Sequence, residues 1–247
     1  MPSRACELAP LRAANAARDR LVLALDVADP AAAVELAQAM KPSFGIMKVG
    51  LELFIAGGPD IVTDVLATGC RVFLDLKLHD IPNTVERAAK RAGALGVSYL
   101  TIHTQGGADM LAAGARGLAA GAADGPRTPS APTVLGVTVL TSDRDAPEGV
   151  LAERAAMAKR AGCGGVICAA PDLGVVSNAA PGLLRVVPGI RPAGVAAMDQ
   201  GRVATPSAAL SAGADLLVIG RAVTAASDPL AAAAAILAES GGALDGA

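Results

Sequence analysis

The sequence predicts an α/β protein built as one closed (β/α)₈ TIM barrel. Three observations predict it. Eight short runs rich in β-branched residues alternate with Ala-rich segments of helical length, polar residues gather at the ends of these runs, and the chain has 247 residues. Eight successive strand and helix units close such a barrel, and its typical length is about 250 residues.

The expected strands are short apolar runs bounded by turn residues. They lie at 21–27, 44–50, 71–79, 99–104, 133–141, 165–170, 184–190 and 215–220. Helices are expected at 30–40, 59–68, 83–95, 148–161, 205–212 and 228–239, with one longer loop at 121–133. A doubly wound open sheet is the structural alternative, although no G-x-G-x-x-G follows the first strand. We expect the barrel domain at 21–240, a leader or extra helix at 1–20, and a C-terminal tail at 241–247.

The composition excludes several classes of function. With 53% hydrophobic and 18% charged residues, the chain can bury a sizeable core, so disorder is not expected. A net charge of -2, no Trp and one Tyr do not suit a nucleic-acid surface, which needs clustered Lys and Arg with stacking aromatic residues. A membrane span needs about 18 uninterrupted apolar residues, and no such run occurs.

The four cysteines, Cys6, Cys70, Cys163 and Cys168, form no C-x-x-C pair and have no clustered histidines to complete a zinc site. We expect them to be small buried side chains in a reducing compartment. The first twenty residues lack the apolar core of a signal peptide. A cytoplasmic protein without a metal is therefore expected.

Polar residues stand where the predicted strands end, which is where barrel active sites collect. They are Asp26, Lys48, Asp75, Lys77, Thr141, Arg191, Gly220 and Arg221. For any one of them, a solvated strand end is the simpler explanation, but their joint placement favours a site. His103 is interpreted as a packing residue or as one behind the site.

Within "FLDLKLHDIPNTV", Asp75 and Lys77 lie two residues apart on one strand, so their side chains share a face. Leu74, Leu76 and Leu78 then face the helices. Lys48, at the end of the neighbouring strand, could join the two charges. An acid flanked by cations in a water-poor pocket keeps its charge fixed before a substrate arrives, although a structural ion pair would do the same.

The last two strands indicate the class of ligand. "VPGIRP" and "IGRAVTAASDP" each place a glycine and an arginine in the loops that commonly bind phosphate in these barrels. Glycine lets backbone N–H groups approach phosphate oxygens, and guanidinium can bind them in a bidentate manner. An ordinary turn with a surface arginine is the alternative.

At these residues the sequence resembles the orotidine 5′-phosphate decarboxylase family. The matching segments run from about Leu21 to Pro229 and are "ALDV", "MKVG", "FLDLKLHDIPNTV", "GVTVLTS", "VVPGIRP", "MDQGR" and "ADLLVIGRAVT". The D-x-K-x-x-D core is shared with related barrel enzymes that act on sugar phosphates, whereas the extended segments are specific.

The resemblance implies decarboxylation of orotidine 5′-phosphate to uridine 5′-phosphate, the last step of de novo UMP synthesis, without a cofactor. It implies that Lys77 donates a proton to carbon 6, that Asp75 lies beside the substrate carboxylate, and that Lys48 and Asp80 complete a charged array. It also implies a homodimer in which Asp80, Ile81 and Thr84 reach the neighbouring site.

The remaining site residues also come from the resemblance. Asp26 matches a ribose contact, Thr141 a contact to the base, and Gln200 a link between base and phosphate. Arg191, Gly220 and Arg221 match the phosphate end. The substrate-binding segment is expected to include Leu76, Leu78, His79, Pro82 and Asn83 as well.

Two alternatives stay open, one of them an enzyme on the same barrel and the other of a different class. A related decarboxylase or aldolase for sugar phosphates would use a magnesium ion held by carboxylates. The resemblance suggests that those enzymes carry a carboxylate where this chain has Lys48. A barrel that binds a phosphate ligand without catalysis would be expected to have lost Lys77 or Asp75, and both are present.

Overall fold

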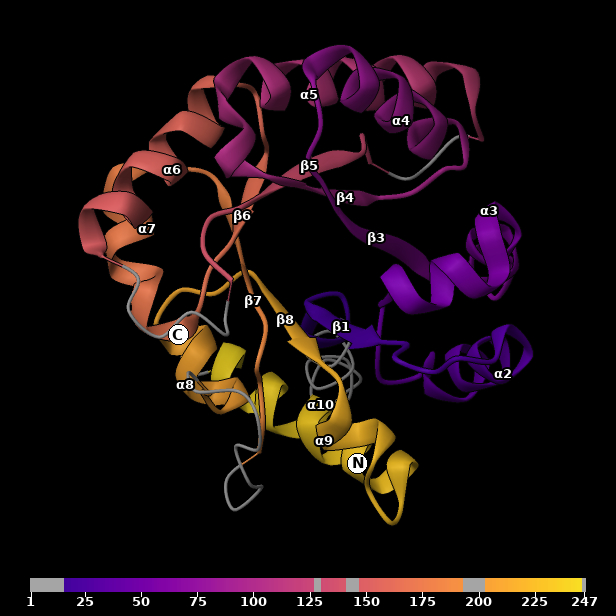
Figure 1. The fold of residues 1–247 in the computed structure, drawn as a ribbon. Coiled ribbons are helices and arrows are strands. Elements are labelled where there is room, and N and C mark those ends of the chain that lie inside the picture. The colour runs from indigo at the N-terminus through magenta and orange to yellow at the C-terminus, as the bar shows by residue number, and fades with distance from the viewer. Residues whose placement is uncertain (1–15, 127–129, 141–146, 193–202, 246–247) are drawn as a thin grey trace, which may run out of the picture.

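The computed structural model describes residues 16–126, 130–140, 147–192 and 203–245. Eight parallel strands close into a barrel in which each strand pairs with the next and β8 pairs with β1, and helices surround them (Figure 1). The strands are β1 (Leu21–Ala24), β2 (Ile46–Gly50), β3 (Arg71–Leu78), β4 (Tyr99–His103), β5 (Thr133–Val137), β6 (Gly165–Ile167), β7 (Leu184–Val187) and β8 (Leu216–Ile219). All eight predicted strands are confirmed, and the open-sheet alternative is wrong.

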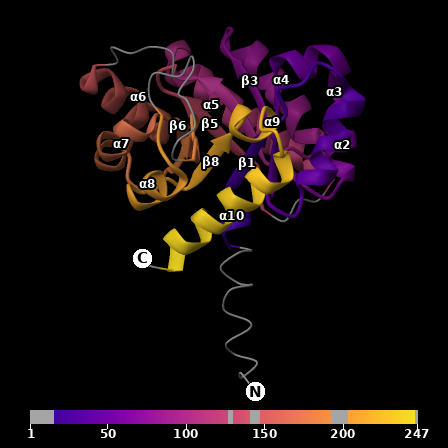
Figure 2. The same ribbon diagram turned by 90° about the horizontal axis from the view of Figure 1, so that it is seen from below.

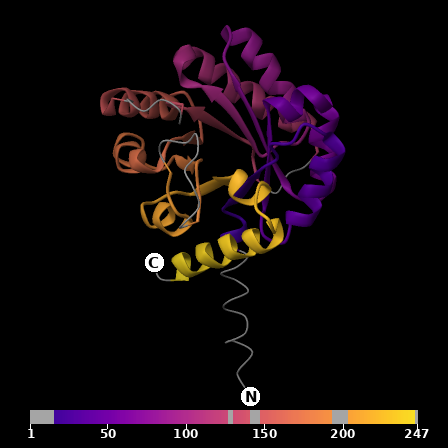
Figure 3. The same cartoon turned by 60° about the horizontal axis from the view of Figure 1, so that its bottom comes forward.

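The helices are α2 (Pro30–Met40), α3 (Leu51–Ala67), α4 (Pro82–Ala94), α5 (Gly107–Asp124), α6 (Glu148–Arg160), α7 (Leu173–Ala179), α8 (Pro206–Ser211), α9 (Arg221–Thr224) and α10 (Pro229–Asp245). Helix α10 continues to Asp245, so most of the segment expected as a tail is helical. It crosses the outside of β8 and β1 and contacts α8, α9 and α2 (Figures 2 and 3).

Helix α3 begins eight residues earlier than the expected start at 59, because Gly58 and Pro59 do not end it. Gly58 adopts φ 59 and ψ -156, and the helix kinks there and continues. A Gly-Pro pair favours a helix break in sequence, but here glycine takes the non-helical backbone conformation that the kink needs.

The strands are buried on both faces, as is usual for parallel barrels. One face of each strand points to the barrel axis, and these side chains form an inner cluster that includes Val22, Ile46, Phe73 and Leu135. The other face packs under the helices in a larger cluster that includes Leu74 and Leu100. This two-layer core makes the barrel a rigid support for the side chains at its rim.

Strand β3 departs from the regular register just before its end. Leu74 pairs with Leu100 and Leu78 pairs with Ile102, so β3 advances four residues while β4 advances two. Within this bulge, Lys77 has φ 48, a left-handed backbone conformation that is uncommon outside glycine. The bulge lies at the C-terminal end of the strand, which is the end that carries the site.

In the part of the chain that the structure describes, no helix is long and apolar enough to cross a membrane.

Candidate active site

A cavity of about 240 Å³ opens at the C-terminal ends of the strands. Its polar lining consists of the predicted residues Asp26, Lys48, Asp75, Lys77, Arg191, Gly220 and Arg221. Its apolar lining includes Phe73, Val137, Ile167 and Val218, which belong to the inner cluster of the barrel. The cavity therefore combines an apolar floor with charges at the rim, an arrangement typical of small-molecule sites.

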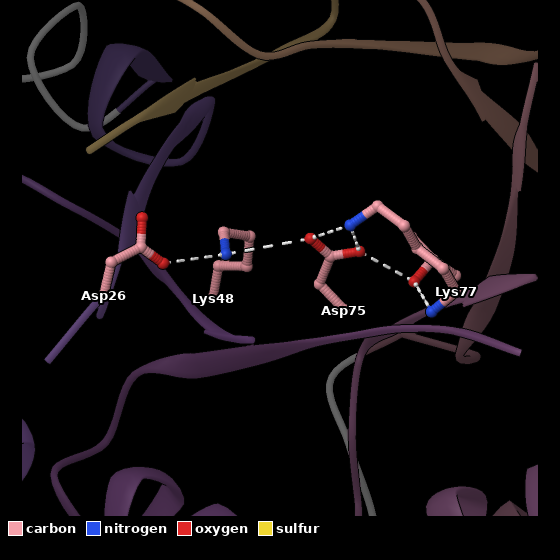
Figure 4. A network of polar contacts seen from close by, with 5 residues as sticks. Asp26, Lys48, Asp75 and Lys77 are labelled. Atoms are coloured by element: carbon pink, nitrogen blue, oxygen red, sulfur yellow. Dashed lines mark hydrogen bonds and ion pairs between the residues drawn. The ribbon is translucent and has the colours of Figure 1, made fainter. Parts of the chain in front are cut away.

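Four charged side chains form a row across one side of this cavity (Figure 4). Lys48 Nζ lies 3.2 Å from Asp26 Oδ1 and 3.7 Å from Asp75 Oδ2. Lys77 Nζ donates to both oxygens of Asp75, at 2.8 and 2.9 Å. The charges alternate in sign along the row, so each cation faces a carboxylate.

The row occurs because neighbouring parallel strands end at the same rim. Asp26 follows β1, Lys48 lies in β2, and Asp75 and Lys77 lie in β3. Leu76 and Leu78 pack against the outer cluster, as the alternation predicts, and so do not line the cavity. The expectation from the resemblance that these two leucines contact substrate therefore has no support in the cavity lining.

The surroundings of Asp75 shift the pKa of its carboxyl. Burial by itself raises the pKa of its carboxyl, but the ammonium groups of Lys48 and Lys77 and the hydrogen bonds from Lys77 and Thr101 lower it further than burial raises it. The net pKa of Asp75 lies below its ordinary value. The carboxylate is therefore ionised in the folded protein at neutral pH.

Thr101, in β4, is a neighbour of the site that was not among the residues predicted from the sequence. Its hydroxyl donates to Asp75 Oδ1 at 2.9 Å and accepts from the backbone N–H of Lys77 at 2.9 Å. The sequence does indicate that Thr101 faces the barrel axis, because it lies two residues after the inward-facing Tyr99 and side chains two residues apart share a strand face.

The residues of the predicted phosphate end line the cavity after β7 and β8. Arg191 follows β7 and is only 6% exposed, and its Nε has no hydrogen-bond partner among the described residues. Gly189, two residues earlier, has φ 78, which explains the glycine in "PGIRP". Gly220 and Arg221 follow β8 directly. A buried guanidinium nitrogen without a partner is costly, so this side of the cavity favours an anion.

The segment after β3 lies outside the cavity lining. It comprises His79, Asp80, Ile81, Pro82, Asn83 and Thr84. Asp80 is exposed and accepts a hydrogen bond from the Ile81 N–H at 2.6 Å. Pro82 begins α4, the position in a helix where proline fits best. Thr141 and Gln200 lie outside the described residues.

His103 is buried and stacks on His79, with ring centroids 5.7 Å apart. Its Nδ1 accepts from the Gln105 N–H at 3.3 Å. Burial lowers its pKa, and the electrostatic effects of His79, Arg154 and Lys77 lower it further, so the neutral ring is favoured. This agrees with the prediction of a packing residue.

Comparison with known proteins identifies the family. The sequence profile of the Orotidine 5'-phosphate decarboxylase / HUMPS family matches residues 19–236. The chain belongs to this family. A relative named Orotidine 5'-phosphate decarboxylase, from Anaeromyxobacter sp. (strain K), is 48% identical over 231 residues, covering 89% of this chain and 97% of the relative. One of the same name from Pseudomonas aeruginosa (strain LESB58) is 44% identical over 238 residues, covering 92% and 100%.

The fold comparison agrees. The crystal structure of Orotidine 5'-phosphate decarboxylase from Lactobacillus acidophilus matches with a TM-score of 0.76 and 35% identity, covering 90% of this chain and 99% of that one. The crystal structure of orotidine 5'-phosphate decarboxylase from Pyrococcus horikoshii OT3 matches with a TM-score of 0.72 and 26% identity, covering 89% and 98%.

Within the orotidine 5′-phosphate decarboxylase / HUMPS family, the rim of this chain does not suit a metal ion between its carboxylates. The Lys48 ammonium already lies between Asp26 and Asp75 and supplies the positive charge there. A divalent cation at the same place would be repelled by Lys48 and by Lys77. The magnesium-dependent alternative is therefore not favoured.

Proposed function

We propose that this chain decarboxylates orotidine 5′-phosphate to uridine 5′-phosphate and carbon dioxide, without a cofactor, as the last step of de novo UMP synthesis. The observation that carries the proposal is the row Asp26, Lys48, Asp75 and Lys77, which ends in an ammonium group at an apolar-floored cavity. Membership of the family and the names of the relatives support the same reaction.

The chemistry needs a fixed cation and a proton. When the bond between carbon 6 and the carboxylate breaks, its electron pair remains on carbon 6, where no adjacent group delocalises it. The Lys77 ammonium would stabilise this charge and transfer one proton to form the new C–H bond. Lys77 is then neutral and takes a proton from water before the next turnover.

The neighbours of Lys77 would keep this charge in place before the substrate binds. Asp75 chelates the Lys77 ammonium with both oxygens, and Lys48 faces Asp75 from the other side. Such preorganised charges act on the transition state without reorganising during the reaction. A carboxylate at Asp75 also repels the carboxylate of the substrate, but stabilisation of the developing carbanion is the stronger argument.

Arg191, Gly220 and Arg221 would bind the phosphate, while Asp26 contacts the ribose and Thr141 and Gln200 contact the base. The buried Arg191 supports an anion at this end. Binding of the distant phosphate holds the base in register with Lys77, so its binding energy contributes to the rate.

We propose that the active form is a homodimer in which Asp80, Ile81 and Thr84 reach the site of the partner. Three large apolar side chains support an interface near the ends of β2 and β3. Leu51 is 53% exposed, Ile55 is 80% exposed and Ile81 is 66% exposed. Leu51 follows β2 directly and Ile81 follows β3, and these two strands pair up to Gly50 and Asp75. Exposed apolar groups at adjacent strand ends are typical of a contact surface.

The proposal includes one catalytic domain at residues 21–240 and a cytoplasmic location. Cys70 and Cys163 are buried free thiols, and Cys168 is also buried, which suits a reducing compartment.

The test is to mix purified protein with orotidine 5′-phosphate and follow both the ultraviolet absorbance of the orotate ring and the release of carbon dioxide. We expect rapid loss of the chromophore, one uridine 5′-phosphate per carbon dioxide, and no effect of a metal chelator. Orotidine without its phosphate should react far more slowly. Chelator-sensitive turnover of a sugar phosphate, with none of orotidine 5′-phosphate, would contradict the proposal.

A further inference from the structure

We infer that Thr101 is a positioning residue for the decarboxylation, because its hydroxyl links the carboxylate of Asp75 to the backbone of Lys77. This inference rests on the proposed function and extends it to a residue that does not line the cavity. Thr101 is fully buried, so its hydroxyl is held among the strands and would act on the substrate only through its two partners.

The two contacts of the hydroxyl fix its orientation. A threonine hydroxyl carries one hydrogen and two lone pairs. The Asp75 carboxylate can only accept, so the hydrogen of Thr101 points to Oδ1, at 2.9 Å. The Lys77 N–H can only donate, so it takes a lone pair of the same oxygen, also at 2.9 Å. One atom therefore satisfies both partners.

The bulge in β3 explains why a side chain is needed here. Between Leu74 and Leu78 the register with β4 shifts, and the N–H of Lys77 bonds to a side chain of β4. Lys77 also has φ 48, a conformation that a non-glycine residue keeps only when its surroundings hold it. The Thr101 hydroxyl supplies a hydrogen-bond acceptor that a regular strand would take from a backbone carbonyl.

The same contact orients the acid. Asp75 Oδ1 is shared by Thr101 and Lys77, while Oδ2 faces Lys48 at 3.7 Å and Lys77 at 2.9 Å. Without the hydroxyl, the carboxylate could rotate and the ammonium group of Lys77 could follow it. A displacement of about 1 Å at a reacting group costs on the order of 10²-fold in rate.

The experiment compares Thr101→Val, Thr101→Ala and Thr101→Ser by steady-state kinetics with orotidine 5′-phosphate. Ala and Ser both remove the methyl group and differ only in the hydroxyl. We expect Val and Ala to lower kcat roughly 10- to 100-fold. KM should change by less than about 3-fold, because the phosphate end is untouched. Serine should restore most of kcat.

A pH profile separates positioning from a loss of stability. Among the described residues, the charged groups that face Asp75 are Lys48 from β2 and Lys77 from its own strand, and Asp26, which follows β1, lies beyond Lys48. Loss of the Thr101 hydrogen bond disfavours the carboxylate form, so the acidic limb of kcat/KM should move to higher pH in Val and Ala. The serine variant should keep the limb of the parent protein.

Thr138→Val is the matched control. Thr138 is also fully buried, and its hydroxyl donates to the Ile167 carbonyl at 2.7 Å, away from Asp75 and Lys77. We expect this variant to lose thermal stability while its acidic limb stays unmoved.

A Thr101→Val enzyme with the parent kcat and an unmoved limb would overturn the inference. If Val does not fold, equal kcat values for Ala and Ser would overturn it in the same way. If the parent protein does not decarboxylate orotidine 5′-phosphate, the proposed function fails separately. The inference is then decided by an NMR titration of ¹³C-labelled aspartate, in which Asp75 must titrate at higher pH in Thr101→Ala than in Thr101→Ser.

Discussion

Lys48 and Lys77 differ in their surroundings although both face Asp75. The Lys48 side chain is 12% exposed and bridges Asp26 and Asp75, whereas the Lys77 side chain is 35% exposed and contacts Asp75 alone among these acids. The more exposed ammonium lies at the open end of the row, where a substrate can reach it. This difference fits the proposed roles, in which Lys77 donates the proton and Lys48 keeps the Asp75 carboxylate in place.

We predict that Lys48→Met lowers kcat about 100-fold or more, as does removal of other preorganised charges. Burial raises the pKa of Asp75, and Lys48 is the largest of the groups that lower it. Its removal therefore raises that pKa. Because activity needs ionised Asp75, activity is lost as pH falls through the folded pKa, and the acidic limb moves to higher pH.

The check is a pH profile of kcat/KM for Lys48→Met beside Lys41→Met. Lys41 Nζ donates to the Thr68 carbonyl at 2.8 Å and does not line the cavity, so its variant controls for loss of a lysine. An acidic limb that stays in place in Lys48→Met would contradict the proposed coupling.

At this scale the sequence predicted much of the site but not all of it. Alternation along β3 and the common rim of parallel strands were enough to bring Asp75, Lys77 and Lys48 together. The alternation along β4 places Thr101 on the inward face, but its two partners depend on the bulge in β3, and a shifted register between two strands leaves no local signal in either one. The expected substrate contacts of Leu76 and Leu78 conflict with the same alternation, which turns both toward the helices.

At the element scale, α4 and α5 pack unusually closely. A Cβ added at Gly117 would collide with the Glu86 carbonyl, and one at Gly121 would collide with the Lys90 carbonyl. Across the interface, a Cβ at Gly93 would collide with the carbonyl of Leu118. The backbones of the two helices are therefore in contact. Because α4 begins at Pro82, the position of α4 also determines where the preceding turn at Asp80 lies.

We predict that Gly121→Ala lowers the free energy of unfolding by about 2 to 3 kcal/mol, because rigid backbone must move to admit the methyl group. In a chain of this size that corresponds to a fall in Tm of roughly 4 to 12 °C. Differential scanning calorimetry measures it.

Gly242→Ala, in α10, is the matched control, since nothing lies within 4 Å of the added Cβ. Alanine is the better helix former by about 1 kcal/mol, so this variant should keep or raise Tm. Equal Tm values for Gly121→Ala and Gly242→Ala would contradict the close packing.

The sequence predicted which helices and strands occur better than it predicted the residues at which they begin and end. Strand order and number followed from the alternation of apolar runs, but none of the expected helix ranges covers α5, α7 or the four-residue α9. Helices α5 and α7 are rich in Gly, Ala or Val, so their polar faces give a weak helical period. The early start of α3 was hidden by Gly58, whose conformation depends on the tertiary structure.

At the scale of the whole molecule, the proposed homodimer shares each site between two chains. Asp80 is exposed and makes its hydrogen bond within its own turn, and Ile81 beside it is also exposed. If the proposed homodimer forms, Asp80 of one chain completes the charged row of the other. Catalysis then depends on association.

We predict that a Lys77→Ala protein and an Asp80→Ala protein are each nearly inactive and regain activity when mixed. A hybrid dimer contains one site with both native residues, so at equal amounts of the two proteins about a quarter of the activity should return by random exchange. The recovered activity is measured against the mixing ratio. No recovery, after exchange of differently tagged chains has been verified, would contradict shared sites.

We propose that the charged row ending in Lys77 performs the decarboxylation. The most direct measurement follows the absorbance of orotidine 5′-phosphate with the parent protein and with Lys77→Ala, after circular dichroism has verified that both are folded. We predict rapid loss of the chromophore with the parent protein and no loss above the protein-free blank with Lys77→Ala. A folded Lys77→Ala protein that consumes the substrate at the parent rate would contradict the claim.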